Sequence, residues 1–155
     1  IRQVIAKIKA AIPDAILRTS LIVGFPGETE EDFNELLKFV EETKFHRLGV
    51  FPYSKEDGTP AVKLDGHLPE KIKQKRYDRI MQKQQLISKE INGSLVGKSL
   101  ECIIDDVTDD GKYYIGRSYR DVPETDGIVL IQSHKEHALG DFVIATITGA
   151  ERDRL

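Results

Sequence analysis

Apolar residues in the first part of the chain follow a helical spacing and then an extended one. In residues 1–12 they recur three and four positions apart with polar residues between them, which predicts an amphipathic helix. Pro13 is expected to end this helix. Residues 16–25 are centred on a continuous apolar run, Leu21-Ile22-Val23, as expected for a strand buried on both faces of a parallel sheet.

The same alternation repeats once more along the chain. Thr29 is a favourable N-cap, and the three acidic residues after it complement the positive end of a second predicted helix. A second strand is predicted at residues 48–53. Helix, strand, helix, strand is the rhythm of an α/β fold, but two repeats are too few to close a barrel. Residues 1–67 are therefore interpreted as a piece of a larger α/β domain.

A long helix is predicted after the turn-rich residues 54–67. It begins at Pro69, ends at Asn92-Gly93 and carries an apolar stripe along one side. The stripe consists of Ile72, Ile80, Ile87 and Ile91, flanked by Tyr77 and Met81. Between these lie basic residues that are expected to form a solvated face, namely Lys71, Lys73, Lys75, Arg76 and Lys83.

The last part of the chain changes to short β-rich runs. These runs cover residues 100–107, 113–118, 128–131 and 142–148, and Asp109-Asp110-Gly111 is a hairpin signal between the first two. The spacing suits a small antiparallel, OB-like β-barrel of about five strands. The chain is thus predicted to combine α/β and all-β parts, with residues 1–67 as the α/β piece, 68–93 as a connecting helix and 94–155 as the barrel.

Composition and cysteine content narrow the function classes. The chain has 155 residues, is 39% hydrophobic, and contains no apolar stretch near the roughly 18 residues that a membrane span needs, so a cytoplasmic protein is predicted. Cys102 is the only cysteine, and its alternation with Leu100 and Ile104 predicts a buried core thiol. A thiolate metal centre cannot be built from one cysteine, and His134 and His137 are interpreted as exposed loop residues. No metal site is therefore assigned to this chain.

The net charge of −3 is unevenly distributed. The connecting segment 68–93 is basic, whereas Asp and Glu outnumber Lys and Arg by 12 to 7 in residues 94–155. Barrels that bind nucleic acids pair basic grooves with exposed aromatic side chains. An acidic module repels phosphate backbones and attracts basic proteins, so a basic protein is favoured over RNA as its partner.

One turn has the composition of a ligand site. Residues 24–29, Gly-Phe-Pro-Gly-Glu-Thr, connect a predicted strand to a predicted helix, where ligands of α/β folds often meet backbone N–H groups. The turn lacks the lysine of a nucleoside-triphosphate P-loop, which excludes that function. A tight strand-to-helix turn in which Pro26 fixes one dihedral remains the alternative.

Two segments resemble a known enzyme family. The run LRTSLIVGFPGETEEDF is similar to the strand, turn and helix late in the barrel of radical S-adenosylmethionine (SAM) enzymes of the methylthiotransferase family, and FPYSKEDGTPA resembles the segment that follows. The resemblance implies a partial TIM-like radical SAM barrel in which Ile22, Val23 and Gly24 lie near the adenine of SAM. Residues 51–53 would line the barrel interior, with ordinary strand packing as the alternative.

The rest of the chain resembles the terminal module of the same family. RYDRIMQKQQLISKEINGSLVGK is similar to the connector that leads into the TRAM domain, and GRSYRDVPETDG at 116–127 to the TRAM sequence of the RimO-type members, which methylthiolate an aspartate of a small-subunit ribosomal protein. Val122 departs from this pattern, which has a smaller residue there. The resemblance implies that Arg117, Asp121, Glu124 and Asp126 dock the substrate; acids that cap nearby backbone groups are the alternative.

The resemblance also implies the chemistry of a longer parent enzyme. Such an enzyme would use SAM and two 4Fe-4S clusters, one to generate a radical and one to deliver sulfur, with cluster cysteines outside this chain. No catalytic residue is assigned here, and the 155 residues alone are expected to be inactive. Two alternatives stay open: a fragment of a tRNA (adenosine) methylthiotransferase, for which tRNA is the less favoured partner on charge, and a non-catalytic TRAM-type binding module.

Overall fold

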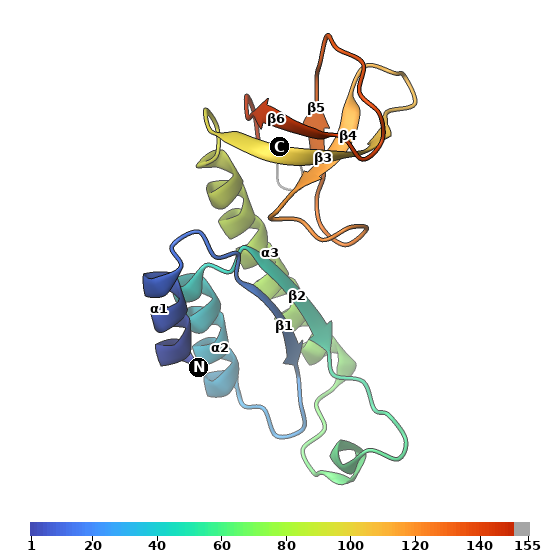
Figure 1. The fold of residues 1–155 in the computed structure, drawn as a ribbon. Helices are drawn as coiled ribbons and strands as arrows, with labels where there is room; N and C mark the ends of the chain where they lie inside the picture. Colours follow the sequence, from blue (N-terminus) through green and yellow to red (C-terminus); the bar gives the residue numbers. More distant parts are fainter. Residues whose placement is uncertain (151–155) are drawn as a thin grey trace. The chain divides into compact units, whose positions relative to one another are not determined.

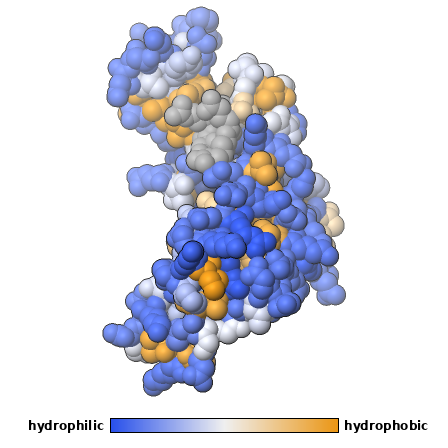
Figure 2. Space-filling view, turned by 180° about the vertical axis from the view of Figure 1, so that it is seen from behind, coloured by the Kyte–Doolittle hydropathy of each residue, from blue (hydrophilic) through white to orange (hydrophobic). Residues whose placement is uncertain are grey.

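A computed structural model describes residues 1–150 of the chain (Figure 1). The chain divides into two compact units, Ile1–Gln84 and Gln85–Leu155, and the boundary falls inside a helix. None of the helices in residues 1–150 combines the length and the apolar character that a bilayer crossing demands. Figure 2 shows one face of the molecule, on which hydrophilic residues predominate and hydrophobic residues form separate small patches.

The first unit contains the predicted α/β elements. They are α1 (Arg2–Ala11), β1 (Arg18–Val23), α2 (Glu30–Thr43), β2 (Arg47–Pro52), a short 3-10 helix η1 (Pro60–Lys63) and the first part of α3 (Glu70–Gly93). Strands β1 and β2 pair in parallel, in a register that runs from Arg18 opposite Arg47 to Val23 opposite Pro52. The predicted alternation of helix and parallel strand is therefore confirmed, with bounds that differ by one or two residues.

Helix α2 begins where the sequence predicts it. The Thr29 hydroxyl accepts a hydrogen bond from the Asp32 N–H at 3.1 Å, and the Asp32 carboxylate accepts one from the Thr29 N–H at 2.9 Å. This reciprocal capping box satisfies two N–H groups that the first helical turn leaves without partners. Hydrogen bonds from the backbone and hydroxyl of Thr29 also hold the pKa of Asp32 below its usual value.

The two strands are buried on one face only. Val23 and Val50 are at most 5% exposed and belong to the core with Phe33 and Val40, whereas Ile22 is 58% exposed. The expectation of a strand buried on both faces is thus wrong for residues 1–150. Alternate side chains of a strand point to opposite faces, and within the first unit the face that carries Ile22 and Phe51 stays exposed.

Helix α3 spans the predicted residues, but its buried side in the first unit is largely polar. Ile72 is 39% exposed, while Lys73, Arg76 and Gln84 are buried together with Ile80. The expected solvated basic face is therefore wrong for Lys73 and Arg76, although Lys71 and Lys75 are exposed as predicted. The place of Ile72 in a buried apolar stripe is also wrong. Lys73 and Arg76 are buried because unit 1 offers carbonyl and carboxylate oxygens that satisfy their charges.

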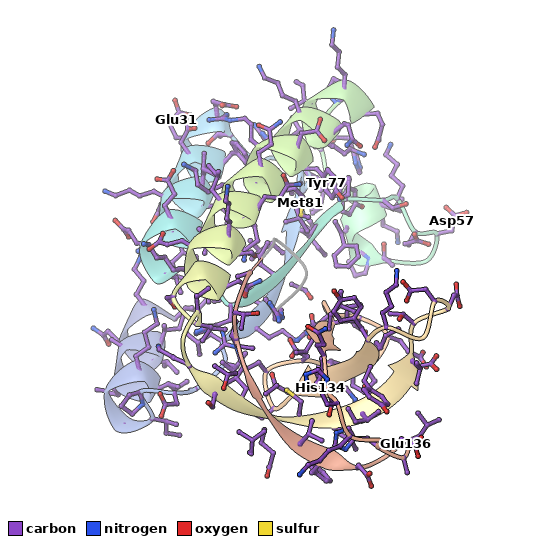
Figure 3. The ribbon with its side chains drawn as sticks, turned by 90° about the horizontal axis from the view of Figure 1, so that it is seen from above. Glu31, Asp57, Tyr77, Met81, His134 and Glu136 are labelled. Carbon is purple, nitrogen blue, oxygen red and sulfur yellow. The ribbon has the colours of Figure 1, made fainter. Side chains whose placement is uncertain are left out.

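The two residues predicted to flank the apolar stripe, Tyr77 and Met81, are neither fully buried nor fully exposed. Tyr77 and Met81 lie one turn apart on α3 and are half-buried (Figure 3). Their spacing of four residues places them on the same side of the helix. They therefore border the buried row of Lys73, Arg76, Ile80 and Gln84 rather than forming part of it.

The second unit is built around an antiparallel sheet. Its strands are β3 (Ser99–Val107), β4 (Tyr114–Ser118), β5 (Val129–Ile131) and β6 (Phe142–Thr146), in the order β5-β4-β3-β6. All four predicted β-rich runs are confirmed as strands. The sequence predicted about five strands, and this sheet has four within residues 1–150; residues 151–155 lie outside the described residues.

The core of the second unit comes mainly from alternate positions of β3 and β5, with Leu95 and Ile147 from segments outside the strands. It consists of Leu95, Leu100, Cys102, Ile104, Val129, Ile131 and Ile147, with Tyr114, Val143 and Ala145 packed against them. Gly116 allows β3 and β4 to approach closely, because a Cβ at this position would lie 2.5 Å from the Ile103 carbonyl oxygen. The register of the two strands also shifts between Ile104 and Asp106, as in a β-bulge.

Candidate functional site

The turn between β1 and α2 is held closed by its own hydrogen bonds. Gly24 has a φ of 73°, in the left-handed region that favours glycine. Its N–H donates to the Glu28 carboxylate at 3.0 Å, and the Glu28 N–H donates to the Phe25 carbonyl at 3.0 Å. The Gly27 N–H donates to the Gly66 carbonyl at 3.0 Å. Three N–H groups of the turn are thus satisfied within the chain.

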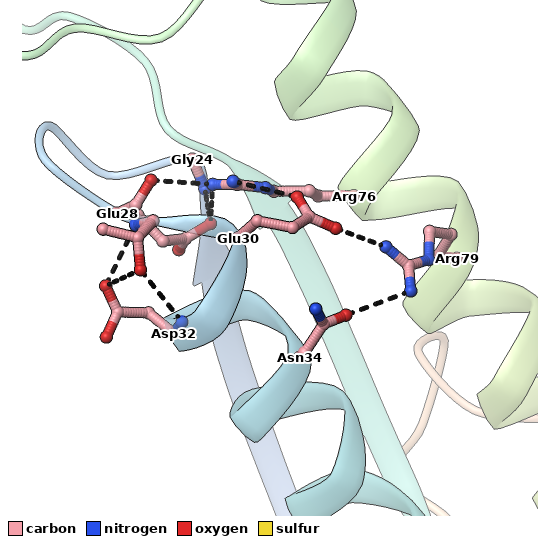
Figure 4. Close-up of polar contacts among 8 residues, drawn as sticks. Gly24, Glu28, Glu30, Asp32, Asn34, Arg76 and Arg79 are labelled. Carbon is pink, nitrogen blue, oxygen red and sulfur yellow. Dashed lines mark hydrogen bonds and ion pairs between the residues drawn. The ribbon is translucent and has the colours of Figure 1, made fainter.

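Arginines from α3 extend this network (Figure 4). Arg76 donates through Nη1 to the Glu28 carboxylate and to the Glu28 carbonyl, the latter at 3.2 Å, and through Nη2 to Glu30 at 3.3 Å. Arg79 donates to Glu30 at 2.9 Å and to Asn34 at 3.2 Å. The hydrogen bond from Arg79 is the largest cause that lowers the pKa of Glu30, although desolvation opposes it.

Lys73 joins α3 to the residue that follows β2. Its Nζ donates to the Tyr53 carbonyl at 2.8 Å and to the Glu70 carboxylate at 2.9 Å. The Tyr53 N–H in turn donates to the Val23 carbonyl at 2.8 Å, and its ring meets that of Phe25 edge-on, with centroids 5.2 Å apart. The carboxyl ends of both strands are therefore tied together and to α3.

The structure separates the three residues that the sequence assigned to the cofactor. The Ile22 side chain lies on the open face of the sheet, where its register partner Phe51 is 57% exposed. The Val23 side chain is fully buried on the opposite face, so only its main chain remains for a ligand. Gly24 is buried, with its N–H bound to Glu28. The apolar surface that a flat ring could contact is therefore formed by Ile22 and Phe51.

The predicted docking residues take different roles in the loop after β4. Asp121 is 9% exposed and accepts hydrogen bonds from the Ser118 N–H at 3.1 Å and the Ser118 hydroxyl at 2.8 Å. Asp126 accepts from the Val122 N–H at 2.8 Å. Both carboxylates thus cap backbone groups, which is the alternative that the sequence left open.

The other two predicted docking residues are more accessible. Arg117 forms an ion pair with Asp105 at 3.0 Å and is partly buried. Glu124 is exposed, lies in the turn at residues 123–125, and has a φ of 60° in the left-handed backbone region. Of the four predicted docking residues, Glu124 is therefore the carboxylate that faces solvent.

Sequence reasoning missed Lys73 and Arg76 as parts of the site. Both were counted with the other basic residues of the connecting helix. Their signal was the spacing, because Lys73, Arg76, Ile80 and Gln84 recur three and four positions apart, as a buried helix face does. A charge at such a position predicts a buried acceptor opposite to it.

Cys102 does not have the environment of a cluster ligand. Its side chain is 1% exposed in the core of the second unit. Burial, followed by the nearby charges of Asp121 and Glu101, raises the pKa of its thiol to about 11. In the part of the chain that the structure describes, no three His, Cys, Asp or Glu residues gather as metal ligands.

Comparison with known proteins places this geometry in a family. Residues 96–155 match the profile of the TRAM domain family. The chain is 51% identical over 97% of its length to "Ribosomal protein uS12 methylthiotransferase RimO" of Alkaliphilus oremlandii, covering 35% of that protein. It is 48% identical over 92% of its length to the protein of the same name from Clostridioides difficile, covering 32% of it.

Over nearly its whole length the chain is similar to the RimO-type methylthiotransferases, and its residues 96–155 match the TRAM domain family. It spans about a third of the length of the curated relatives that it matches. The resemblance predicted from the two halves of the sequence is thereby confirmed, including the TRAM domain, whose matched segment contains β3 to β6. The match extends over nearly the whole chain, so the turn at residues 24–29 and the paired arginines of α3 both lie within the part that the RimO-type proteins share in sequence.

Proposed function

We propose that this chain is the C-terminal part of a radical SAM enzyme that methylthiolates an aspartate of a small-subunit ribosomal protein. The observation that carries the proposal is the identity of 44–51% to proteins named ribosomal protein uS12 methylthiotransferase. Such identity over nearly the full chain exceeds what a shared TRAM domain alone would require. A ribosomal substrate would place the enzyme in the cytoplasm.

The open face of the β1–β2 sheet fits one side of a SAM site. Ile22 and Phe51 offer adjacent apolar side chains for the adenine. The main chain of Val23 and Gly24 lies beside them, at the carboxyl end of β1. Bound SAM would supply the radical and the methyl group. The residues of this chain would orient the cofactor and exclude water from one side of it.

The iron-sulfur clusters would be held by residues outside these 155. Cluster iron is held by several thiolates, whereas the chain has one cysteine, Cys102, which is buried with a raised pKa. The chain by itself would therefore be inactive. Its contribution would be to complete the SAM barrel and to present the TRAM domain.

The TRAM unit would dock the ribosomal protein by charge. Residues 94–155 carry 12 acidic and 7 basic residues, which favours a basic partner. In the turn after β4, Glu124 is exposed next to Pro123, whose ring restricts the backbone and lowers the entropy lost on binding. Asp121 and Asp126 would support the loop from within.

Product analysis tests the proposal directly. The full-length protein that contains this chain would be reconstituted with iron and sulfide and incubated with SAM, a reductant and either the purified small-subunit ribosomal protein or total tRNA. Mass spectrometry should find a methylthio group on an aspartate of the ribosomal protein. A methylthio adduct on tRNA alone would contradict the choice of substrate, and no adduct on either would contradict the reaction class.

A further inference from the structure

We propose that Arg76 of α3 is a positioning residue for the turn formed by residues 24–29. The guanidinium would keep Glu28 in the conformation that binds the Gly24 N–H, and so set the main-chain path at the edge of the SAM site. The inference rests on the proposed function for the identity of the ligand. The contact network itself does not depend on that function.

The Glu28 carboxylate accepts hydrogen bonds from the turn and from α3. One oxygen, Oε1, receives the Gly24 N–H at 3.0 Å and also the Arg76 Nη1 donor. Gly24 has a left-handed backbone, so the direction of the chain after β1 depends on the group that holds its N–H. Because one carboxylate oxygen binds both donors, a change in the position of Arg76 is transmitted to Gly24.

The ion pair between Arg76 and Glu28 is largely buried. The Arg76 side chain is 6% exposed and the Glu28 side chain 12% exposed. The guanidinium carbon also lies 5.3 Å from the centre of the Phe33 ring. Removing one member of a buried pair leaves the other charge without compensation, so Glu28 would turn toward water rather than stay under the turn.

Arg76 belongs to the same compact unit as the turn. The sequence divided the chain after residue 67, which puts Arg76 in a connecting helix outside the α/β piece. The structure groups Ile1–Gln84 in one compact unit. Two contacts of α3 reach Glu28 in the turn, one reaches Glu30 at the start of α2, and one reaches Tyr53 after β2. A shortened protein that ends before α3 would thus lack a part of the cofactor site.

Three variants and one reporter separate positioning from a general effect of charge. In the 155-residue chain, hydrogen exchange at the Gly24 amide would be followed by NMR in Arg76→Ala, Arg76→Lys and Arg79→Ala. Arg79 is the matched control, because it lies one turn away and pairs with Glu30 but not with Glu28. Exchange rates at amides of the β1–β2 pair around Thr19 and Leu48, in the same unit but at the opposite end of the strands from the turn, would report whether each variant is folded.

Arg76→Ala should raise the exchange rate of the Gly24 amide by about tenfold or more, which is the scale of a lost charge-assisted hydrogen bond. Arg76→Lys keeps one donor and should restore part of the protection. Arg79→Ala should leave the Gly24 rate unchanged. Equal rates in Arg76→Ala and in the unaltered chain, or an equal rise in Arg79→Ala, would overturn the positioning role.

SAM affinity of the reconstituted full-length protein supplies the second readout. Arg76→Ala should weaken SAM binding by about tenfold while Arg79→Ala retains it, and Arg76→Lys should be intermediate. Unchanged SAM affinity in Arg76→Ala with an exposed Gly24 amide would overturn the link to the cofactor. If the unaltered protein fails to bind SAM, the proposed function fails, whereas the amide measurement still decides whether Arg76 positions the turn.

Discussion

The side chain of Lys73 lies directly over Gly24, so that a Cβ added to Gly24 would stand 2.5 Å from the Lys73 Cγ. Gly27, in the same turn, also has a positive φ, but a Cβ there would meet nothing within 4 Å. The two glycines therefore share the same backbone requirement and differ in the space around them. This difference makes them a matched pair for mutation.

Gly27→Ala should lower the free energy of unfolding by about 1–2 kcal/mol, the cost of a left-handed alanine. Gly24→Ala should cost about 1–3 kcal/mol more, because it adds overpacking against a buried lysine stem. Denaturant unfolding of both variants measures the difference. Lys73→Ala should be less damaging in the Gly24→Ala background than alone, and strictly additive costs would show that the two residues do not clash.

Substitutions of Asp121 and Glu124 should differ in effect, because Asp121 supports the fold and Glu124 is proposed to bind the substrate. Asp121→Ala removes the acceptor for the Ser118 N–H and hydroxyl, and should lower the free energy of unfolding by about 1–3 kcal/mol. Glu124→Ala should change stability by no more than about 0.5 kcal/mol. Thermal unfolding measures both values.

Binding to the basic ribosomal protein completes that comparison. Glu124→Ala should weaken the binding of the full-length protein in a salt-sensitive way while its unfolding temperature stays constant. If Glu124→Ala binds as the unaltered protein does, the exposed carboxylate has no part in docking.

The start of α2 should show an acid-dependent stability. Thr29→Ala removes the cap and should cost about 1 kcal/mol at neutral pH. The pKa of Asp32 lies below its usual 3.8 in the folded chain because Thr29 donates to it, so its contribution is full above that value and is lost as the pH falls through the folded pKa. Asp32→Asn should therefore flatten the decline of stability below pH 3.8, as measured by urea unfolding at stepped pH.

Cys102 should react slowly until the chain unfolds. With the pKa of its thiol raised to about 11 from an ordinary value of 9.0, the thiolate fraction near pH 8 falls by on the order of a hundredfold. Burial slows access further. Alkylation followed by mass spectrometry should give slow labelling of the native chain and rapid labelling in denaturant; rapid native labelling would contradict the buried thiol.

Substitution on the exposed face of the β1–β2 sheet should leave the stability of the 155-residue chain nearly unchanged but weaken SAM binding by the full-length enzyme. Ile22→Ser should change the free energy of unfolding by no more than about 0.5 kcal/mol, because the side chain is 58% exposed. Val23→Ala, its buried neighbour, should cost about 2 kcal/mol. In the reconstituted full-length protein, Ile22→Ser should weaken SAM binding. Retained affinity would place the adenine elsewhere.

Local patterns in the sequence determined the elements of this protein. The capping residues at Thr29, the apolar run before Gly24 and the turn signals between the β-rich segments act over a few residues, so their structural outcome could be predicted without tertiary contacts. The burial of Cys102 followed in the same way from alternation along β3. The likeness to the RimO-type methylthiotransferases followed from longer stretches of similar sequence.

Only the tertiary structure decided which charges are solvated and which are held inside. Lys71 and Lys73 look alike in a basic helix, but Lys73 meets the Tyr53 carbonyl and Lys71 meets water. Asp121 and Glu124 look alike in an acidic loop, but Asp121 caps Ser118 and Glu124 faces solvent. A charged side chain is buried only where partners from distant segments satisfy it, and the positions of those partners emerge only when the chain has folded.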